Sequence, residues 1–121
     1  MKNCVDIEIL KRRTKVNPLL MMEMITLYLQ QTPSLIQSLK KGLKDNDMQI
    51  MQATAHKMIP SFSIMGIQGD GEIMSKKLVQ YNAQLMAFDE LEYLVLQLEM
   101  LCTQACEELE REYDTIKYGK L

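Results

Sequence analysis

The side chain with the clearest chemical potential in this sequence is its single histidine, His56. An imidazole exchanges protons near neutral pH, and its unprotonated nitrogen can act as a nucleophile or as a metal ligand. Haem or metal binding would need a second ligand, such as a methionine, and no ligand pattern accompanies His56. Three interpretations of His56 therefore stay open at this point: a plain surface residue, a nucleophile for group transfer, and a metal or haem ligand.

Other chemical signatures are scarce. The sequence contains no glycine-rich phosphate loop, no G-x-S-x-G and no H-E-x-x-H, so nothing in it indicates ATP binding. The paired carboxylates Glu107 and Glu108 are expected on exposed helix positions. Three cysteines do not pair off as a disulfide framework, and we expect Cys102 and Cys106 to be small core residues in a reducing compartment.

The helix face that carries His56 has an unusual composition. At about 100° per residue, His56 lies roughly 130° from the centre of the apolar stripe of its helix. The residues on its side are uncharged: Gln49, Gln52, Ala53, Ile59, Pro60, Ser63, Ile64 and Ile67. This composition indicates an apolar docking surface around one imidazole, although a face that packs under another helix would look the same.

Pro60 lies four residues after His56. In a continuous helix its nitrogen would meet the carbonyl of His56, but proline has no N–H to donate and its ring crowds that carbonyl. We therefore expect the backbone near His56 to be bent or to have a free acceptor.

Capping and proline signals place the first helices. One short helix is expected from Asp6 to Thr14. Asn17-Pro18 starts the next, because proline is tolerated at the first helical position. Thr32-Pro33 predicts a break or a kink, after which helix resumes and ends at the polar turn 45–47.

The remaining helices follow from apolar spacing. A helix from about Asp47 to Met65 has the clearest stripe: Met48, Met51, Ala55, Met58, Phe62 and Met65. Glycines then mark a turn. A fourth helix is expected to carry Met74, Leu78, Tyr81 and Leu85. After a connection within 82–89, the last helix is expected from Asp89 to Lys117. Amphipathic helices joined by short turns predict a single all-α domain, 1–121: an antiparallel four-helix bundle with one or two short N-terminal helical segments.

Composition limits the class of protein. The 121 residues are 47% hydrophobic and 25% charged, with a net charge of −2, which suits a globular domain and does not favour a nucleic-acid partner. The one basic cluster, at 11–15, is expected at the C-terminal end of the first helix. No apolar run approaches the roughly 18 residues that span a bilayer, and no leader is evident, so a soluble, cytoplasmic chain without a membrane partner is expected.

The run 55–67 resembles the signature of histidine-containing phosphotransfer (HPt) domains. That signature reads roughly His-x-Leu-Lys-Gly-Ser, followed by a glycine five residues after the serine. His56 stands at the place of the phosphorylated histidine and Met58 at that of the leucine, while Ser61 and Gly66 match the serine and the glycine. The resemblance covers roughly residues 5–80 and, more loosely, the last helix.

Two positions depart from the signature. Ile59 stands where the family usually has a lysine that steadies the phosphoryl group, and Pro60 stands where it usually has glycine. The candidates for supporting roles are Lys57, Ser61, Lys76 and Lys77.

The resemblance implies a phosphorelay intermediate rather than an enzyme. His56 would accept a phosphoryl group from the aspartyl phosphate of a receiver domain and pass it to another receiver aspartate, with Mg²⁺ and most of the catalysis supplied by the receiver. The docking residues would be Gln52, Ile59, Pro60, Ser63, Ile64 and Ile67. The alternative is a helical module with a degenerate HPt fold that binds receivers without transfer. Whether the domain is free-standing or fused to, or encoded near, a hybrid sensor kinase stays open.

Overall fold

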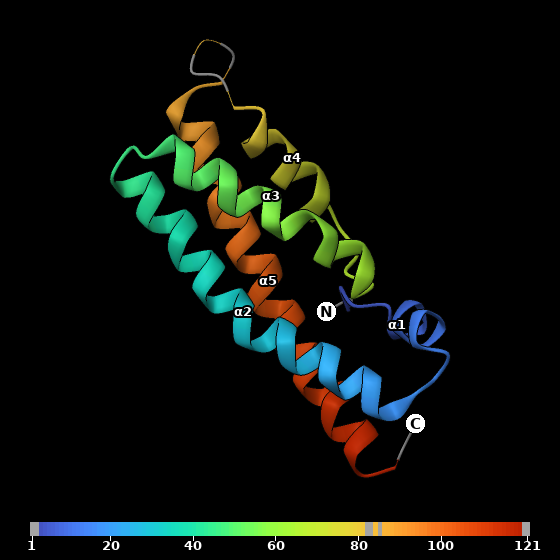
Figure 1. The fold of residues 1–121 in the computed structure, drawn as a ribbon. Coiled ribbons are helices and arrows are strands. Elements are labelled where there is room, and N and C mark those ends of the chain that lie inside the picture. The colour runs from blue at the N-terminus through green and yellow to red at the C-terminus, as the bar shows by residue number, and fades with distance from the viewer. Residues whose placement is uncertain (1–2, 82–83, 85, 120–121) are drawn as a thin grey trace.

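The computed structural model describes residues 3–81, 84 and 86–119, and five α-helices account for most of them. Successive helices of the bundle run antiparallel, and the first helix lies across one end (Figure 1). The predicted all-α bundle is therefore confirmed, with one short N-terminal helix before it. The helices are α1 (Ile7–Thr14), α2 (Pro18–Lys44), α3 (Met48–Ile64), α4 (Gly71–Val79) and α5 (Phe88–Lys117).

Side-chain caps start three of these helices where the sequence predicted. The carboxylate of Asp6 accepts a hydrogen bond from the N–H of Glu8, and Asp47 caps α3 in the same way. Asn17 caps α2, directly before the proline at its first position. Each cap satisfies an N–H that has no partner within the helix, which fixes the helix start. The basic cluster falls in the last turn of α1 as expected.

Of the break or kink predicted at Thr32-Pro33, the break is absent, because α2 continues through Pro33. Thr32 and Ile36 are buried on either side of the exposed proline ring. Packing of this continuous apolar face offsets the roughly 3 kcal/mol that an interior proline costs a helix. The local proline signal was thus overridden by tertiary packing.

The end of α4 also differs from the prediction. The helix contains Met74 and Leu78 but ends at Val79, so Tyr81 lies beyond it, and Leu85 lies outside the described residues together with positions 82 and 83 of the predicted connection. The last helix begins at Phe88, one residue earlier than expected.

The core lies between α2, α3, α4 and α5. The predicted stripe of α3 is confirmed, since all of its members are buried except Met48, which is half-buried. It meets fully buried side chains of the other three helices: Met21, Ile25, Leu39, Leu78, Leu91, Leu98 and Leu109. Cys102 is also buried and Cys106 half-buried, and both are free thiols. None of the helices in the described part of the chain combines the length and hydropathy needed to cross a bilayer.

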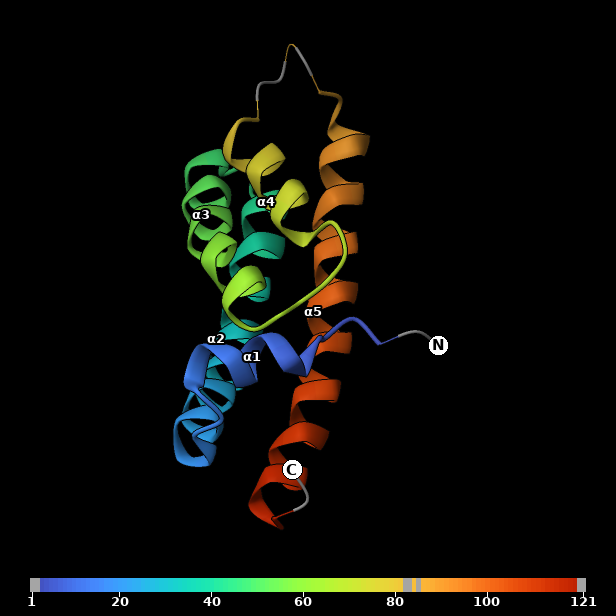
Figure 2. The same ribbon diagram turned by 90° about the vertical axis from the view of Figure 1, so that its right-hand side faces the viewer.

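Residues 3–6, the N-terminal strap, cross α5 near the C-terminal end of α3, and α5 continues past them (Figure 2). Val5 pairs with Ile67 in an isolated antiparallel bridge, and the N–H of Asp6 donates to the carbonyl of Gly66 at 2.7 Å. Gly66 has a φ of +70°, and a Cβ there would collide with the carbonyl oxygen of Asp6. Glycine is required because the strap passes so close.

A buried carboxylate anchors the strap to α5. Glu108 is 5% exposed and accepts hydrogen bonds from the N–H groups of Cys4 at 3.0 Å and Val5 at 2.9 Å. The side-chain amide of Gln104 donates a third at 2.8 Å. The expectation that both carboxylates of the 107–108 pair are exposed is therefore wrong for Glu108. Its position on the inner side of α5, opposite the strap, depends on tertiary contacts that the helix period does not reveal.

Candidate functional site

His56 lies in the middle of α3 on the side opposite the buried stripe. Its side chain is exposed, whereas its neighbours Ala55 and Met58 are buried. The imidazole makes no hydrogen bond to any residue in the described part of the chain. Both ring nitrogens are therefore open to a reactant that approaches from solvent.

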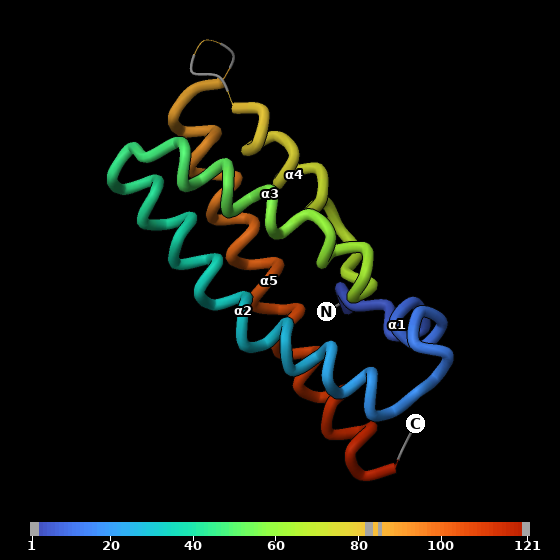
Figure 3. Tube along the Cα trace, viewed as in Figure 1, coloured from blue at the N-terminus to red at the C-terminus, as the bar shows by residue number. Residues whose placement is uncertain are grey.

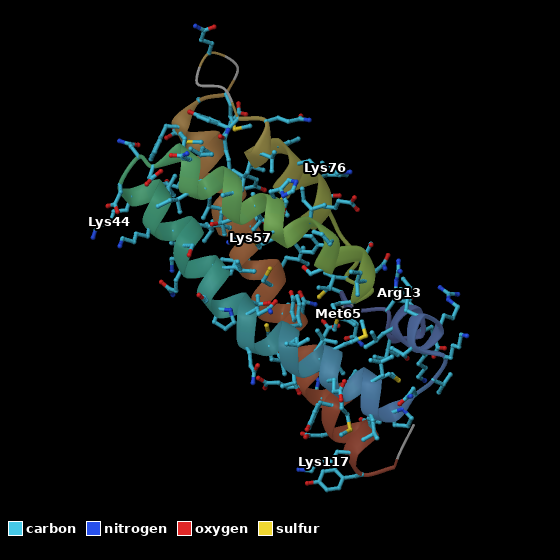
Figure 4. The ribbon with its side chains drawn as sticks, in the orientation of Figure 1. Arg13, Lys44, Lys57, Met65, Lys76 and Lys117 are labelled. Carbon is cyan, nitrogen blue, oxygen red and sulfur yellow. The ribbon has the colours of Figure 1, made fainter. Side chains whose placement is uncertain are left out.

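The lysines predicted to support His56 lie on α3 and α4. Apart from His56 itself, Lys57 is the only ionisable residue of α3, and it is exposed. On α4, Lys76 and Lys77 are exposed, and the ammonium of Lys76 pairs with Glu72 at 3.0 Å. Figure 4 shows Lys57 and Lys76 on the neighbouring helices α3 and α4. With no carboxylate on α3 itself, an incoming dianionic phosphoryl group meets no acidic side chain on this helix.

The predicted docking residues divide by burial. Pro60 and Ser63 are exposed, and Gln52 and Ile59 are half-buried. Ile64 is half-buried and packs against the core.

Ile67 is a correction to the predicted docking surface, because it is only 7% exposed. The helix ends at Ile64 and the chain turns at Gly66, so the helical wheel does not extend to residue 67. Its side chain instead faces the core while its backbone pairs with the strap at Val5. The exposed face around His56 therefore reaches Ser63 but does not extend to Ile67.

Two polar side chains of this region are held by the protein backbone. The amide of Gln52, one turn before His56, donates to the carbonyl of Tyr81 at 3.3 Å and ties α3 to the segment after α4. The hydroxyl of Ser61 donates to the carbonyl of Met58 at 2.7 Å. Because Pro60 has no N–H, the helical acceptor at His56 gets no bond from that position. These bonds fix α3 around the histidine.

A basic depression at the end of α3 was not predicted. Arg12 and Arg13 of α1 line a depression of about 480 Å³ together with Ser63 and Gly66, and Glu72 is the one carboxylate in this lining, so its net charge is positive. Ser63 follows His56 by seven residues, so the depression begins about 10 Å further along the same helix face. The basic cluster was visible in the sequence, but nothing in its spacing shows that the strap would bring α1 to this place.

The cysteine thiols do not compete with His56 as nucleophiles. Burial raises the pKa of Cys102 and of Cys106 to about 11, and burial together with the nearby charge of Glu108 raises the pKa of Cys4 to about 12. These thiols are protonated at neutral pH, and the thiolate is the reactive form. Among the residues that the structure describes, no group of three or more histidine, cysteine, aspartate or glutamate side chains could hold a metal ion.

The chain matches no family model, and it has no significant match among curated proteins or solved structures.

Proposed function

We propose that this protein is a phosphocarrier that receives a phosphoryl group on His56 from a receiver domain and delivers it to a second receiver. An imidazole nitrogen of His56 attacks the phosphorus of the receiver's aspartyl phosphate. The N–P bond forms as the O–P bond breaks, and the receiver carboxylate leaves. The second receiver reverses the step, because its aspartate oxygen attacks the phosphohistidine and the imidazole leaves.

The observation that carries this proposal is the setting of His56. It is an exposed imidazole without a hydrogen bond to the described residues, on an uncharged face of a helical bundle. A plain surface histidine would normally be surrounded by lysines and glutamates on its own helix face. Here a partner can approach closely, because Ala53, Pro60 and Ser63 are exposed neighbours along the face and all three are small.

Charge also favours a receiver as the partner. The aspartyl phosphate of a receiver lies in an acidic cluster that holds Mg²⁺, so its surroundings are negative apart from the metal. The basic depression lined by Arg12 and Arg13 lies beside the docking face and complements such a surface. In this division of work the receiver supplies Mg²⁺ and most of the catalysis, and this chain supplies the nucleophile. The cytoplasm, where receivers operate, is the corresponding location.

The test is transfer of labelled phosphate. Purified receiver domains from the same organism, loaded with ³²P on aspartate, are mixed with the full chain and with His56→Gln. We expect an acid-labile, base-stable adduct on the wild-type chain and none on His56→Gln. The variant should fold normally, because substitutions of exposed residues change stability by under about 0.5 kcal/mol. Label on a folded His56→Gln protein would refute the proposal.

The second candidate function is receiver binding without transfer. Ile59 favours it, because the family's lysine is missing at this half-buried position and no charge replaces it there. A receiver that binds the chain, measured by calorimetry, and yet retains all of its label would select this candidate.

A further inference from the structure

A long groove lies between α4 and α5, away from His56. Helix α4 has nine residues and α5 has thirty, so most of α5 has no α4 beside it. The tube in Figure 3 shows α5 continuing well beyond the end of α4. The groove has a volume of about 820 Å³, and none of its lining residues belongs to α3.

The groove exposes large apolar side chains from both of its helices. Ile73 of α4 is 56% exposed, and Tyr93 and Met100 of α5 are 60% and 58% exposed. Leu94 and Leu101 line the same groove and are more deeply buried. Exposing an apolar cluster of this kind to water is unfavourable, so covering it would stabilise a complex. Exposed apolar clusters rimmed by polar groups commonly mark interaction sites.

The rim of the groove is acidic. Asp70 and Glu107 line it and form no ion pair with any described residue, while Glu99 is paired with Lys40 at 2.9 Å. Lys77 is the one cation among the lining residues. From Phe88 to Glu110, α5 has no lysine or arginine, and its acidic residues are Asp89, Glu90, Glu92, Glu99, Glu107, Glu108 and Glu110.

We propose that this groove binds a basic amphipathic α-helix of a partner protein. Tyr93 and Glu107 are fourteen residues apart, or about 21 Å along α5, which matches about four turns of a docked helix. The apolar face of that helix would cover Ile73, Tyr93 and Met100. Its lysines or arginines would lie near Asp70 and Glu107, where opposite charge favours association.

The acidic rim argues against two other occupants. A second copy of this chain in a two-fold pair would place α5 against α5, and carboxylates would face carboxylates. Nucleic acid would bring its phosphates to the same acidic surface. A basic helix satisfies both the apolar floor and the charge of the rim.

The experiment uses the full chain and a synthetic probe. The probe is a fifteen-residue capped peptide with leucines at i, i+4, i+7 and i+11 and lysines at most other positions, and the control peptide replaces each lysine by glutamate. We expect the lysine peptide to bind with chemical-shift changes confined to the groove, and the glutamate peptide to bind at least about tenfold more weakly.

Matched variants locate the interaction. Asp70→Lys combined with Glu107→Lys should weaken binding at least about tenfold, and Ile73→Asn about fivefold, whereas Asp114→Lys, outside the groove on α5, should change it less than twofold. Circular dichroism checks that each variant is folded. Equal binding of both peptides, or an equal loss in Asp114→Lys, overturns the proposal. So does a concentration-dependent dimer that Ile73→Asn abolishes, because the groove then belongs to a second copy.

Discussion

Two polar side chains of this bundle, His56 on α3 and Glu108 on α5, are treated in opposite ways. Glu108 is almost completely buried, and its carboxylate accepts three hydrogen bonds, two from the strap and one from Gln104. His56 is exposed and has no hydrogen bond to the described residues. The carboxylate of Glu108 is bonded within the fold, and the imidazole of His56 is open to solvent.

The difference shows how burial separates a side chain that stabilises the fold from one that a reactant in solvent can reach. A buried charge is tolerated only when it is hydrogen-bonded, and the same burial keeps a reactant in solvent away from the carboxylate of Glu108. An exposed imidazole contributes little to the free energy of unfolding, so the stability of the fold does not depend on it. Removing Glu108 should therefore affect stability, and removing His56 should affect only chemistry.

The largest expected effect comes from Glu108→Ala. The variant leaves the N–H groups of Cys4 and Val5 without their acceptor and removes these bonds between the strap and α5. Because hydrogen bonds to a charged group contribute about 1.5–3 kcal/mol each, we expect the free energy of unfolding to fall by about 3 kcal/mol. Urea denaturation at pH 7 measures it.

Glu107→Ala is the matched control, because Glu107 is the adjacent carboxylate and is exposed. It should change the free energy of unfolding by under about 0.5 kcal/mol. Similar losses in both variants would mean that Glu108 is not a structural anchor, and the contrast with His56 would fail.

Lowering the pH should remove the contribution of Glu108 to the free energy of unfolding. Burial disfavours its charged form, but hydrogen bonds from the N–H groups of Cys4 and Val5 outweigh burial and hold the pKa of Glu108 below its usual 4.5. A lowered pKa in the folded state stabilises the protein above the usual pKa, and this stabilisation is lost as the pH falls through the folded value. The stability gap between wild type and Glu108→Gln should be largest above about pH 5 and narrow below pH 4.5. Denaturation series from pH 7 to pH 3 would show it, and a constant gap would contradict it.

The two prolines inside helices, Pro33 and Pro60, allow effects on stability to be separated from effects near His56. Pro33 and Pro60 are both exposed inside helices. Replacing either by alanine should raise the free energy of unfolding by about 2 kcal/mol, because alanine restores an N–H, while the unfolded chain gains some freedom. Only Pro60→Ala should also slow phosphotransfer, by about threefold, because it removes part of an apolar ring from the docking face. Thermal melts and transfer assays on both variants test this, and equal transfer rates would place docking elsewhere.

Much of the fold could be predicted from local sequence. The caps at Asp6 and Asn17, the start of α3 near Asp47 and the stripe of α3 depend on neighbouring residues in one helix, so periodicity and capping rules found them. The sequence left open whether Thr32-Pro33 breaks or kinks the helix, since the local proline pattern favours a helix end and only packing against other helices keeps α2 continuous. The end of α4 at Val79 was missed because the apolar spacing continues to Tyr81 after the helix has stopped.

The candidate site was also predicted only in part, because some of its features depend on one helix and others depend on contacts between distant segments. The exposure of His56 follows from the helical wheel of α3 alone. The wheel fails at Ile67 because the helix has ended and the strap covers that residue. The burial of Glu108 and the position of Arg12 near Ser63 arise from contacts between segments far apart in the sequence. Helix periodicity cannot predict such contacts.

The smallest expected effect concerns Ile59, on the same helix and one turn after His56. Its side chain is half-buried at the edge of the docking face, in the place where HPt domains usually have lysine. In Ile59→Lys the aliphatic stem can follow the buried path of the isoleucine while the ammonium reaches solvent near the imidazole. A partly solvated charge pair contributes up to about 1 kcal/mol, so the phosphohistidine should form up to about fivefold faster. Ile59→Gln removes the same apolar contact without adding charge and should not be faster than wild type. Rapid-quench measurements with one labelled receiver compare the three proteins. If the lysine variant is no faster than the glutamine variant, charge next to His56 does not limit transfer, and the open imidazole by itself sets the rate.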